Sequence, residues 1–139
     1  MFDEYNKERN GFCVELIRIY QCLCNATRLR IMHLLTRGPL CVCHFQEILD
    51  IPQTKVSQQL AYLRKHGLVE CTRHGTWMIY SLPSKPSGKL EASLKCLQDC
   101  SLTDKRFRGD LKALEKVRSA CGWIGEVLEN KRTCSCQSP

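Results

Sequence analysis

The spacing of apolar residues changes at Gly67, and this change constrains the fold more than any other feature of the chain. Before Gly67, apolar residues recur with a helical period, which predicts short helices over about 41–49 and 53–66. After it, 68–73 and 76–82 are rich in β-branched and aromatic residues and are joined by a tight turn, which predicts a β-hairpin. This order is typical of a winged helix-turn-helix, whose second helix enters the major groove of DNA.

Four further helices are predicted around this unit, so the fold class is α+β: mainly α-helical, with a small β-hairpin. They are an amphipathic helix within 12–23, a helix capped by Asn25 and ended by Gly38-Pro39, a helix through 90–97, and a helix over about 104–120 capped by Thr103. A chain of 139 residues suffices for one such domain. We assign residues 1–120 to a single winged helix-turn-helix domain and residues 121–139 to a cysteine-containing C-terminal tail.

The helix over 53–66 has one apolar and one polar face. Val56, Leu60 and Leu63 are predicted to face the body of the domain. The opposite face has no acidic residue, whereas a merely solvated helix more often carries pairs of Glu and Lys. Its amides, hydroxyls and lysine suit contacts with base edges and phosphates. The residues predicted to contact DNA are Gln53, Thr54, Lys55, Ser57, Gln58, Gln59 and Tyr62.

The positive charge of the chain is concentrated around this helix and hairpin. The whole sequence has a net charge of +7, and residues 51–90 hold six basic residues against one acidic residue. A focused basic region is the expected footprint of nucleic-acid binding, and a solvated surface without a partner is the alternative. Arg73 and His74, at the predicted hairpin tip, are candidates for contacts with phosphate or the minor groove, or else parts of an ordinary exposed turn.

Eleven cysteines, an odd number, are the other unusual feature of the chain. In an exported protein this density would indicate a disulfide framework. The first twenty residues carry four acidic groups and no long apolar block, so no signal peptide is predicted, and no apolar run is long enough to span a membrane. We therefore expect a cytoplasmic protein without a membrane partner, whose thiols fill the core, bind a metal or undergo redox chemistry.

Segments on four predicted elements resemble, in order and spacing, the ArsR/SmtB family of metal- and metalloid-sensing repressors. They are Asn-Ala-Thr-Arg-Leu-Arg-Ile-Met at 25–32, Leu-Cys-Val-Cys at 40–43, the stretch 53–69 and the hairpin residues 73–82. The Leu-Cys-Val-Cys segment is similar to that of the arsenic- and cadmium-responsive branches. The resemblance implies a homodimer, formed mainly by the helices within 12–23 and 90–97, that binds operator DNA and releases it when ligand binds.

Cys41 and Cys43 are the predicted metal or metalloid ligands. Residues two apart on a regular helix point about 200° apart, so both can face one ion only if the first turn is loosened or begins between them. A helix N-terminus favours thiolates, which suit trivalent arsenic or antimony and also cadmium, zinc or lead. Ligation here would distort the first DNA-binding helix and so oppose operator binding. The alternative is two small buried residues at a helix start.

The chain departs from the arsenic-responsive pattern at one position. A third cysteine usually follows the second by three residues, and this chain has Gln46 there. A trivalent ligand therefore needs a third thiol from elsewhere. We favour Cys13, because this resembles relatives in which an N-terminal cysteine of one subunit completes a site on the other. Cys134 and Cys136 in the C-terminal tail are the alternatives.

The remaining cysteines and the histidines have less specific predictions. Cys22 and Cys24 are expected to be small buried residues, Cys71 and Cys121 to lie in the core, Cys96 and Cys100 to pack in an interface, and His33 and His66 to lie at the surface or at helix ends. His44 is expected to be exposed, or to be a fourth ligand if the ion is zinc.

The favoured function is a repressor that responds to trivalent arsenic or antimony. A repressor that responds to cadmium, zinc or lead, and a DNA-binding regulator switched by thiol oxidation, are the alternatives. An enzyme is not expected, because the chain lacks a Ser/His/Asp order, a phosphate-binding glycine loop and paired carboxylates in an apolar setting. It also lacks the Cys-x-x-Cys motif of a thiol oxidoreductase, and no obligatory cofactor is predicted.

Overall fold

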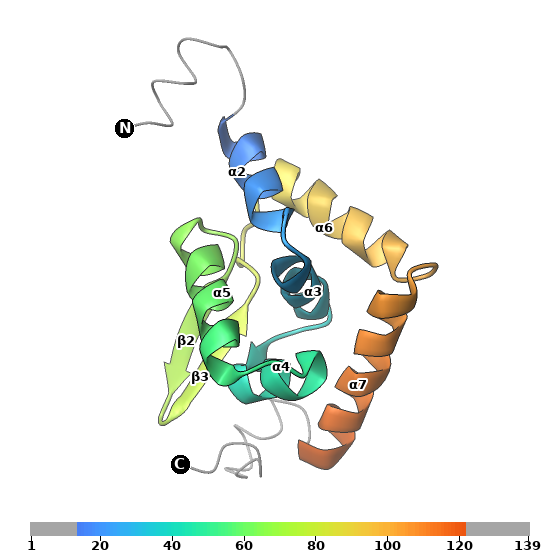
Figure 1. The fold of residues 1–139 in the computed structure, drawn as a ribbon. Coiled ribbons are helices and arrows are strands. Elements are labelled where there is room, and N and C mark those ends of the chain that lie inside the picture. The colour runs from blue at the N-terminus through green and yellow to red at the C-terminus, as the bar shows by residue number, and fades with distance from the viewer. Residues whose placement is uncertain (1–13, 122–139) are drawn as a thin grey trace.

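The computed structural model describes residues 14–121, which form six helices and one three-stranded sheet (Figure 1). The elements are, in chain order, α2 (Val14–Leu23), α3 (Ala26–Leu35), β1 (Leu40–Cys41), α4 (Val42–Leu49), α5 (Gln53–Lys65), β2 (Glu70–His74), β3 (Trp77–Ser81), α6 (Gly88–Cys100) and α7 (Lys105–Cys121). The predicted α+β class, with a helix-turn-helix followed by a hairpin, is confirmed. Within residues 14–121, no helix is long and apolar enough to span a membrane.

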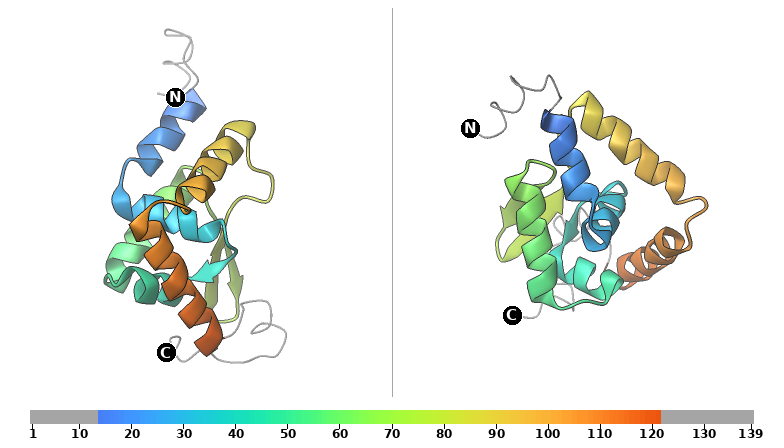
Figure 2. Two further views of the ribbon diagram at one scale, coloured as in Figure 1. Left: turned by 90° about the vertical axis from the view of Figure 1, so that its right-hand side faces the viewer. Right: turned by 45° about the horizontal axis from the view of Figure 1, so that its top comes forward.

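The helices place the predicted DNA-binding unit at one end of the molecule (Figures 1 and 2). α2 and α6 pack together at one end, while α4, α5 and the hairpin lie toward the other. α7 returns along the outside and packs against α3 and α4. Buried apolar residues of these helices, among them Ile31, Phe45, Leu60, Leu94 and Leu114, form one continuous core. This core fixes α4 and α5 relative to the rest of the domain.

Side-chain caps determine where helices begin. Asn25 Oδ1 accepts the backbone N–H of Arg28 at 3.0 Å, which confirms the predicted cap of α3. The predicted Thr103 cap of the last helix is wrong, because Asp104 Oδ1 accepts the backbone N–H of Phe107 at 3.1 Å. An ionised carboxylate interacts favourably with the helix dipole in addition to making the hydrogen bond, so the cap lies one residue later.

Two left-handed residues delimit the helix-turn-helix. Asp50 ends α4 with φ 55° and ψ 49°, and α5 then begins after Pro52. Gly67 ends the helical part as predicted, with φ 79°. The backbone N–H of Leu68 donates to the carbonyl of Leu63 at 2.9 Å, which is the six-residue bond of a Schellman cap. The chain therefore leaves α5 in a fixed direction and enters the hairpin.

A third strand, β1, adds to the hairpin and was not predicted. Its two residues pair antiparallel with Tyr80 and Ile79 of β3, so the strand order is β1-β3-β2. Two residues are too few to show a strand period in the sequence. Through this pairing the segment that starts α4 becomes part of the wing sheet.

The hairpin turn lies one residue later than predicted. His74 still pairs with Trp77, so the turn consists of Gly75 and Thr76 rather than His74 and Gly75. Gly75 has φ 63°, a conformation that glycine adopts without the strain of a Cβ atom.

Two side chains differ in burial from the sequence prediction. His33 lies in the last turn of α3, as one of its two predicted places, but it is fully buried and its ring stacks on Phe107 with centroids 4.2 Å apart, so a surface position is wrong. The reason is α7, which is distant in sequence and covers that side of α3. Cys24 is exposed, so its predicted burial is also wrong, whereas Cys22 is fully buried as expected.

Candidate functional site

Cys41, Cys43 and His44 form a cluster at the start of α4, the first helix of the helix-turn-helix. Their candidate ligand atoms lie within 4.8 Å of one another, and no other such group of three was found within residues 14–121. Cys41 and His44 are buried, and Cys43 is half-buried. Two sulfurs and one imidazole nitrogen make a soft donor set, which suits thiophilic ions.

The position of the helix boundary brings the two thiols together. Cys41 precedes α4 with extended backbone angles, φ −90° and ψ 164°, while Cys43 already belongs to the first helical turn. The helix thus begins between the two cysteines, which is one of the two conditions under which both sulfurs can face one ion. A helix N-terminus also favours the thiolate form of a cysteine, which is the form that binds soft ions.

His44 closes the cluster by capping the same helix end. The backbone N–H of Cys41 donates to His44 Nδ1 at 3.3 Å, and the Cys41 side chain faces the backbone N–H of His44, which together form a capping box. Burial lowers the pKa of His44 to about 4, so the ring is neutral, as a metal ligand must be. The prediction of an exposed His44 is wrong, because the cap draws the ring into the helix start.

The cluster also touches the wing. Cys41 packs against Ile79 of β3, and Cys43 and Trp77 pack around that pair. Cys41 is in addition paired with Ile79 in the sheet. One residue therefore belongs to the ligand cluster, to the cap of α4 and to the wing sheet.

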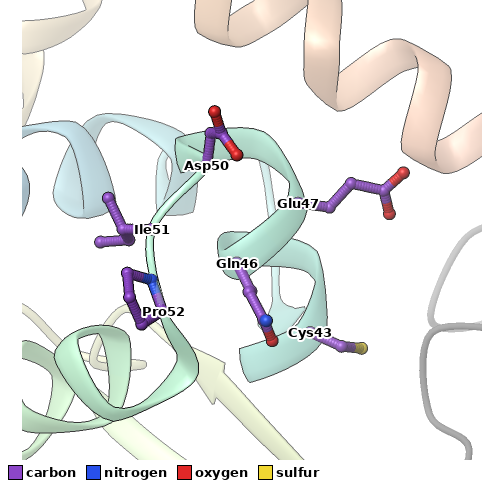
Figure 3. A pocket seen from close by; sticks show the side chains of 6 residues that line it. All are labelled: Cys43, Gln46, Glu47, Asp50, Ile51 and Pro52. Atoms are coloured by element: carbon purple, nitrogen blue, oxygen red, sulfur yellow. The ribbon is translucent and has the colours of Figure 1, made fainter.

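Cys43 lines a depression of about 530 Å³ on the outer side of α4 (Figure 3). Gln46, Glu47 and the Asp50–Pro52 link complete its lining. Figure 3 shows that the Cys43 side chain projects outward from α4, on the same side as Glu47. Gln46, the position of the missing third cysteine, lies one turn after Cys43 and lines the same depression. A solute can reach Cys43 from this side.

α5 has the two faces that its sequence pattern predicts. Val56, Leu60 and Leu63 are fully buried. The residues predicted to contact DNA lie on the remaining surface: Gln53, Thr54, Lys55, Gln58 and Tyr62 are exposed, and Ser57 and Gln59 are half-buried. At the hairpin tip, Arg73 and His74 are exposed, and Arg73 Nε donates to the carbonyl of Gly75 at 3.1 Å.

The sequence matches known regulators over the same region. Residues 25–70 match the family described as "Bacterial regulatory protein, arsR family". The "Arsenical resistance operon repressor" of Escherichia coli is 35% identical over 88 residues, which cover 60% of this chain and 75% of that protein. The chain belongs to the ArsR family. "Arsenic resistance transcriptional regulator ArsR1" of Pseudomonas putida is 36% identical over 84 residues, covering 60% of this chain and 66% of that protein.

A solved structure agrees with the ArsR fold. HlyU from Vibrio cholerae superimposes with a TM-score of 0.59 at 26% identity, covering 69% of this chain and 99% of HlyU. This ArsR-family chain is a DNA-binding transcriptional regulator and not an enzyme.

Among the thiols that the structure of this ArsR-family chain describes, only Cys41 and Cys43 belong to the α4 cluster. Cys13, Cys134 and Cys136, the three candidates for a third ligand, lie outside the described residues, as does the side chain of Cys121. Cys96 and Cys100 are exposed on α6, and Cys71 is half-buried on β2 rather than in the core. Their predicted interface packing stays a prediction for the first two, since only one chain is described.

Arg28 is a residue whose importance the sequence did not reveal. It belongs to the family-like segment 25–32, but its side chain bonds to Gln59 and to the end of α2. These partners are up to 31 positions away, so neither spacing nor periodicity could identify the contact.

Proposed function

We propose that this ArsR-family chain is a homodimeric repressor that leaves its operator when trivalent arsenic or antimony binds Cys41 and Cys43. The observation that carries the proposal is the start of α4 between the two cysteines, with Cys41, Cys43 and His44 ligand atoms within 4.8 Å of one another. The names of the Escherichia coli and Pseudomonas putida relatives, both regulators of arsenic resistance, support the choice of ion. A repressor that acts on operator DNA is expected in the cytoplasm.

The chemistry of binding is ligand exchange without oxidation. Arsenite, As(OH)₃, exchanges hydroxyls for cysteine sulfurs, and each thiol proton leaves with a hydroxyl as water. In the ligand-free protein the Cys41 sulfur faces the backbone N–H of His44, so a bond to arsenic competes with the cap of α4. Cys41 also pairs with Ile79 in the wing sheet. Ligation thus perturbs both α4 and the wing, and each ligand disfavours the other by about 1–3 kcal/mol.

The third thiol is proposed to be Cys13 of the partner subunit. In Figures 1 and 2 the start of α2, which directly follows Cys13, lies at the opposite end of the molecule from α4. This separation disfavours Cys13 of the same chain, and the proposal for the partner's Cys13 rests on the resemblance to relatives in which an N-terminal cysteine of one subunit completes a site on the other. The tail is the second candidate, because Arg118 near the end of α7 donates to the carbonyl of Arg37 at 2.7 Å, a few residues before β1. Cys134 and Cys136 follow from that end of α7.

The proposed dimer face lies on α2 and α6. A groove of about 750 Å³ runs between them, and its lining is mainly apolar: Leu16, Tyr20, Leu23, Leu29, Ala92 and Leu97. Tyr20 is 63% exposed and Ile17 is 42% exposed on the same helix. A second copy of the chain would cover this apolar surface, which is costly to leave in water.

A titration of the operator complex tests the proposed inducer. An operator fragment is selected from a random-sequence library, labelled with a fluorophore and followed by anisotropy as sodium arsenite is added in the presence of reductant. We expect release of DNA together with the ultraviolet absorbance of sulfur–arsenic bonds. Release by peroxide alone would instead establish a redox switch, and release by cadmium or zinc but not arsenite would establish a metal sensor.

A complementation test assigns the third thiol. A mixed dimer of a Cys13→Ser chain with a Cys41→Ser/Cys43→Ser chain retains one complete site only if Cys13 acts across the interface. We expect this mixed dimer to respond to arsenite although neither homodimer does. If Cys13→Ser homodimers respond fully and Cys134→Ser/Cys136→Ser homodimers do not, the third thiol belongs to the tail.

The metal-responsive alternative rests on His44. Its neutral imidazole lies in the same cluster as both thiols, and zinc is commonly bound by mixed sulfur and nitrogen ligands. A His44→Ala variant separates the two functions, because it should weaken a zinc response while leaving two arsenic–sulfur bonds available.

A further inference from the structure

Arg28 connects three helices through one side chain. Its Nε donates to the carbonyl of Cys22 at 2.8 Å, and another guanidinium nitrogen donates to the carbonyl of Gln21 at 3.2 Å. The remaining arm donates to Gln59 Oε1 on α5 at 2.9 Å. The guanidinium carbon also lies over the ring of Tyr62, 4.1 Å from its centroid. Arg28 itself stands in the first turn of α3.

These contacts join the end of α2 to one edge of α5. The last carbonyls of a helix have no partner inside the helix, and Arg28 satisfies two of those near the end of α2. The same planar group holds one edge of α5 through a charge-assisted hydrogen bond and a cation–π contact. The rigid fork of a guanidinium fixes the directions of these bonds relative to one another.

We propose that Arg28 is a positioning residue that sets the orientation of α5 relative to α2, and thereby the half-site spacing that the dimer accepts. The inference rests on the proposed function, in which α2 carries the dimer face and α5 enters the major groove. In a two-fold dimer the distance between the two recognition helices depends on how each is held relative to the dimer face. Arg28 is a direct polar link between these two elements.

Gln59 and Tyr62 have a defined role in this arrangement. Both were predicted to contact DNA, yet both are held by Arg28 on the edge of α5 that faces the junction of α2 and α3. We infer that Gln59 and Tyr62 serve to hold α5 against Arg28. Direct contacts with DNA are then made by Gln53, Thr54 and Gln58, which are exposed on α5.

The test measures operator affinity as a function of half-site spacing. The selected operator is compared with versions in which one base pair is inserted or removed between half-sites, which changes both the separation and the rotation of the sites. We expect the wild-type dimer to prefer one spacing by about tenfold or more, and Arg28→Ala to reduce that preference to within about threefold. Gln59→Leu should act in the same direction, whereas Gln59→Glu retains an acceptor for Arg28 and should keep the preference.

Arg30→Ala is the matched control. Arg30 lies on the same helix and makes equally short bonds, at 2.8 and 2.9 Å, but to Asp110 of α7 rather than to α5. It should lower the thermal midpoint without changing the spacing preference. If Arg28→Ala does not fold, Arg28→Lys, which keeps the charge but loses the fork, takes its place.

The outcomes separate this inference from the proposed function. Equal weakening at every spacing by Arg28→Ala or Arg28→Lys, with the preference intact, would overturn the positioning role and leave the dimeric repressor standing. A wild-type protein without any spacing preference would contradict the dimeric function on which the inference rests. The Arg28 variants should still release operator DNA when arsenite is added, which is measured in parallel.

Discussion

Two Cys-x-Cys pairs of the same spacing have different environments in this chain. Cys22 lies inside α2 and is fully buried, and Cys24 lies beyond the end of that helix and is exposed. Cys41 and Cys43 instead stand on either side of the start of α4, and their ligand atoms converge with that of His44. Within the described residues, only the second pair has a third donor beside it.

The difference lies in the kind of helix end that falls between the two thiols, since their spacing is the same: α4 starts between Cys41 and Cys43, whereas α2 ends between Cys22 and Cys24. One residue in extended conformation followed by the first helical turn lets two sulfurs approach one point. At the end of α2 the boundary falls after Cys22, so that pair is divided between the core and solvent. The cap at Cys41 also holds His44 beside the two thiols. Cys22 and Cys24 have no comparable third donor within the described residues.

The largest expected effect comes from removing each pair in turn. Cys41→Ser/Cys43→Ser should bind the operator normally and lose the arsenite response, because the coupling of about 1–3 kcal/mol, or about 5–150-fold in operator affinity, disappears. Cys22→Ala/Cys24→Ser, the pair with the same spacing, should keep the response. Anisotropy titrations with arsenite measure both. If Cys22→Ala/Cys24→Ser lost the arsenite response while Cys41→Ser/Cys43→Ser kept it, the ligand pair would be Cys22 and Cys24 instead.

The helices could be predicted from the sequence because they depend on local signals, whereas the ligand role of Cys41 and Cys43 stays a prediction. Each of these signals involves only a few neighbouring residues: the apolar periods on either side of Gly67, the Asn25 cap, and the glycine that ends α5. Helix geometry alone gives the condition under which Cys41 and Cys43 converge, but the position at which α4 begins is a property of the folded chain.

The features that the sequence did not reveal depend on partners distant in the chain. β1 is too short to have a period and exists through its pairing with β3. His33 is buried because α7 covers it, and Arg28 acquires its role from Gln59 on α5. The burial of His44 is a local exception, since it follows from a cap in which a cysteine, an uncommon capping residue, takes part.

A stability measurement sharpens the contrast within the first pair. Cys22→Ser places a hydroxyl in a fully buried site, which should lower the free energy of unfolding by about 1–3 kcal/mol where the hydroxyl finds no partner. Cys24→Ser, at an exposed site, should change it by no more than about 0.5 kcal/mol. Urea denaturation followed by circular dichroism measures both. If the two substitutions changed the free energy of unfolding equally, the buried position of Cys22 and the exposed position of Cys24 would not differ in their contribution to stability.

Adding a sulfur tests whether the second pair lacks only its third ligand. Gln46 follows Cys43 by one helical turn and lines the same depression, so Gln46→Cys should supply a local thiol. In a Cys13→Ser background it should restore the arsenite response and lower the half-release concentration by about tenfold or more, which is about 1.4 kcal/mol. Gln46→Ser controls for the loss of the amide. If Gln46→Cys restores nothing, the missing ligand is not the reason for the weakened response.

The smallest expected effect is a dependence of stability on alkaline pH that Cys22 alone contributes. Burial raises the pKa of the Cys22 thiol above its ordinary value of 9.0, and the charges of Arg28 and Arg18 oppose the rise without cancelling it. The unfolded chain loses this proton near pH 9 while the folded chain keeps it, so the contribution is fully present below pH 9 and is lost as the pH rises toward the folded pKa.

Urea midpoints of the wild-type protein and Cys22→Ala, taken from pH 8 to pH 10, isolate this contribution. Other titratable groups are common to both proteins and cancel in the difference. The two curves should converge with rising pH. Parallel curves would mean that the Cys22 thiol ionises as readily in the folded chain as in the unfolded one. The comparison between the two members of the first pair would then rest on packing alone.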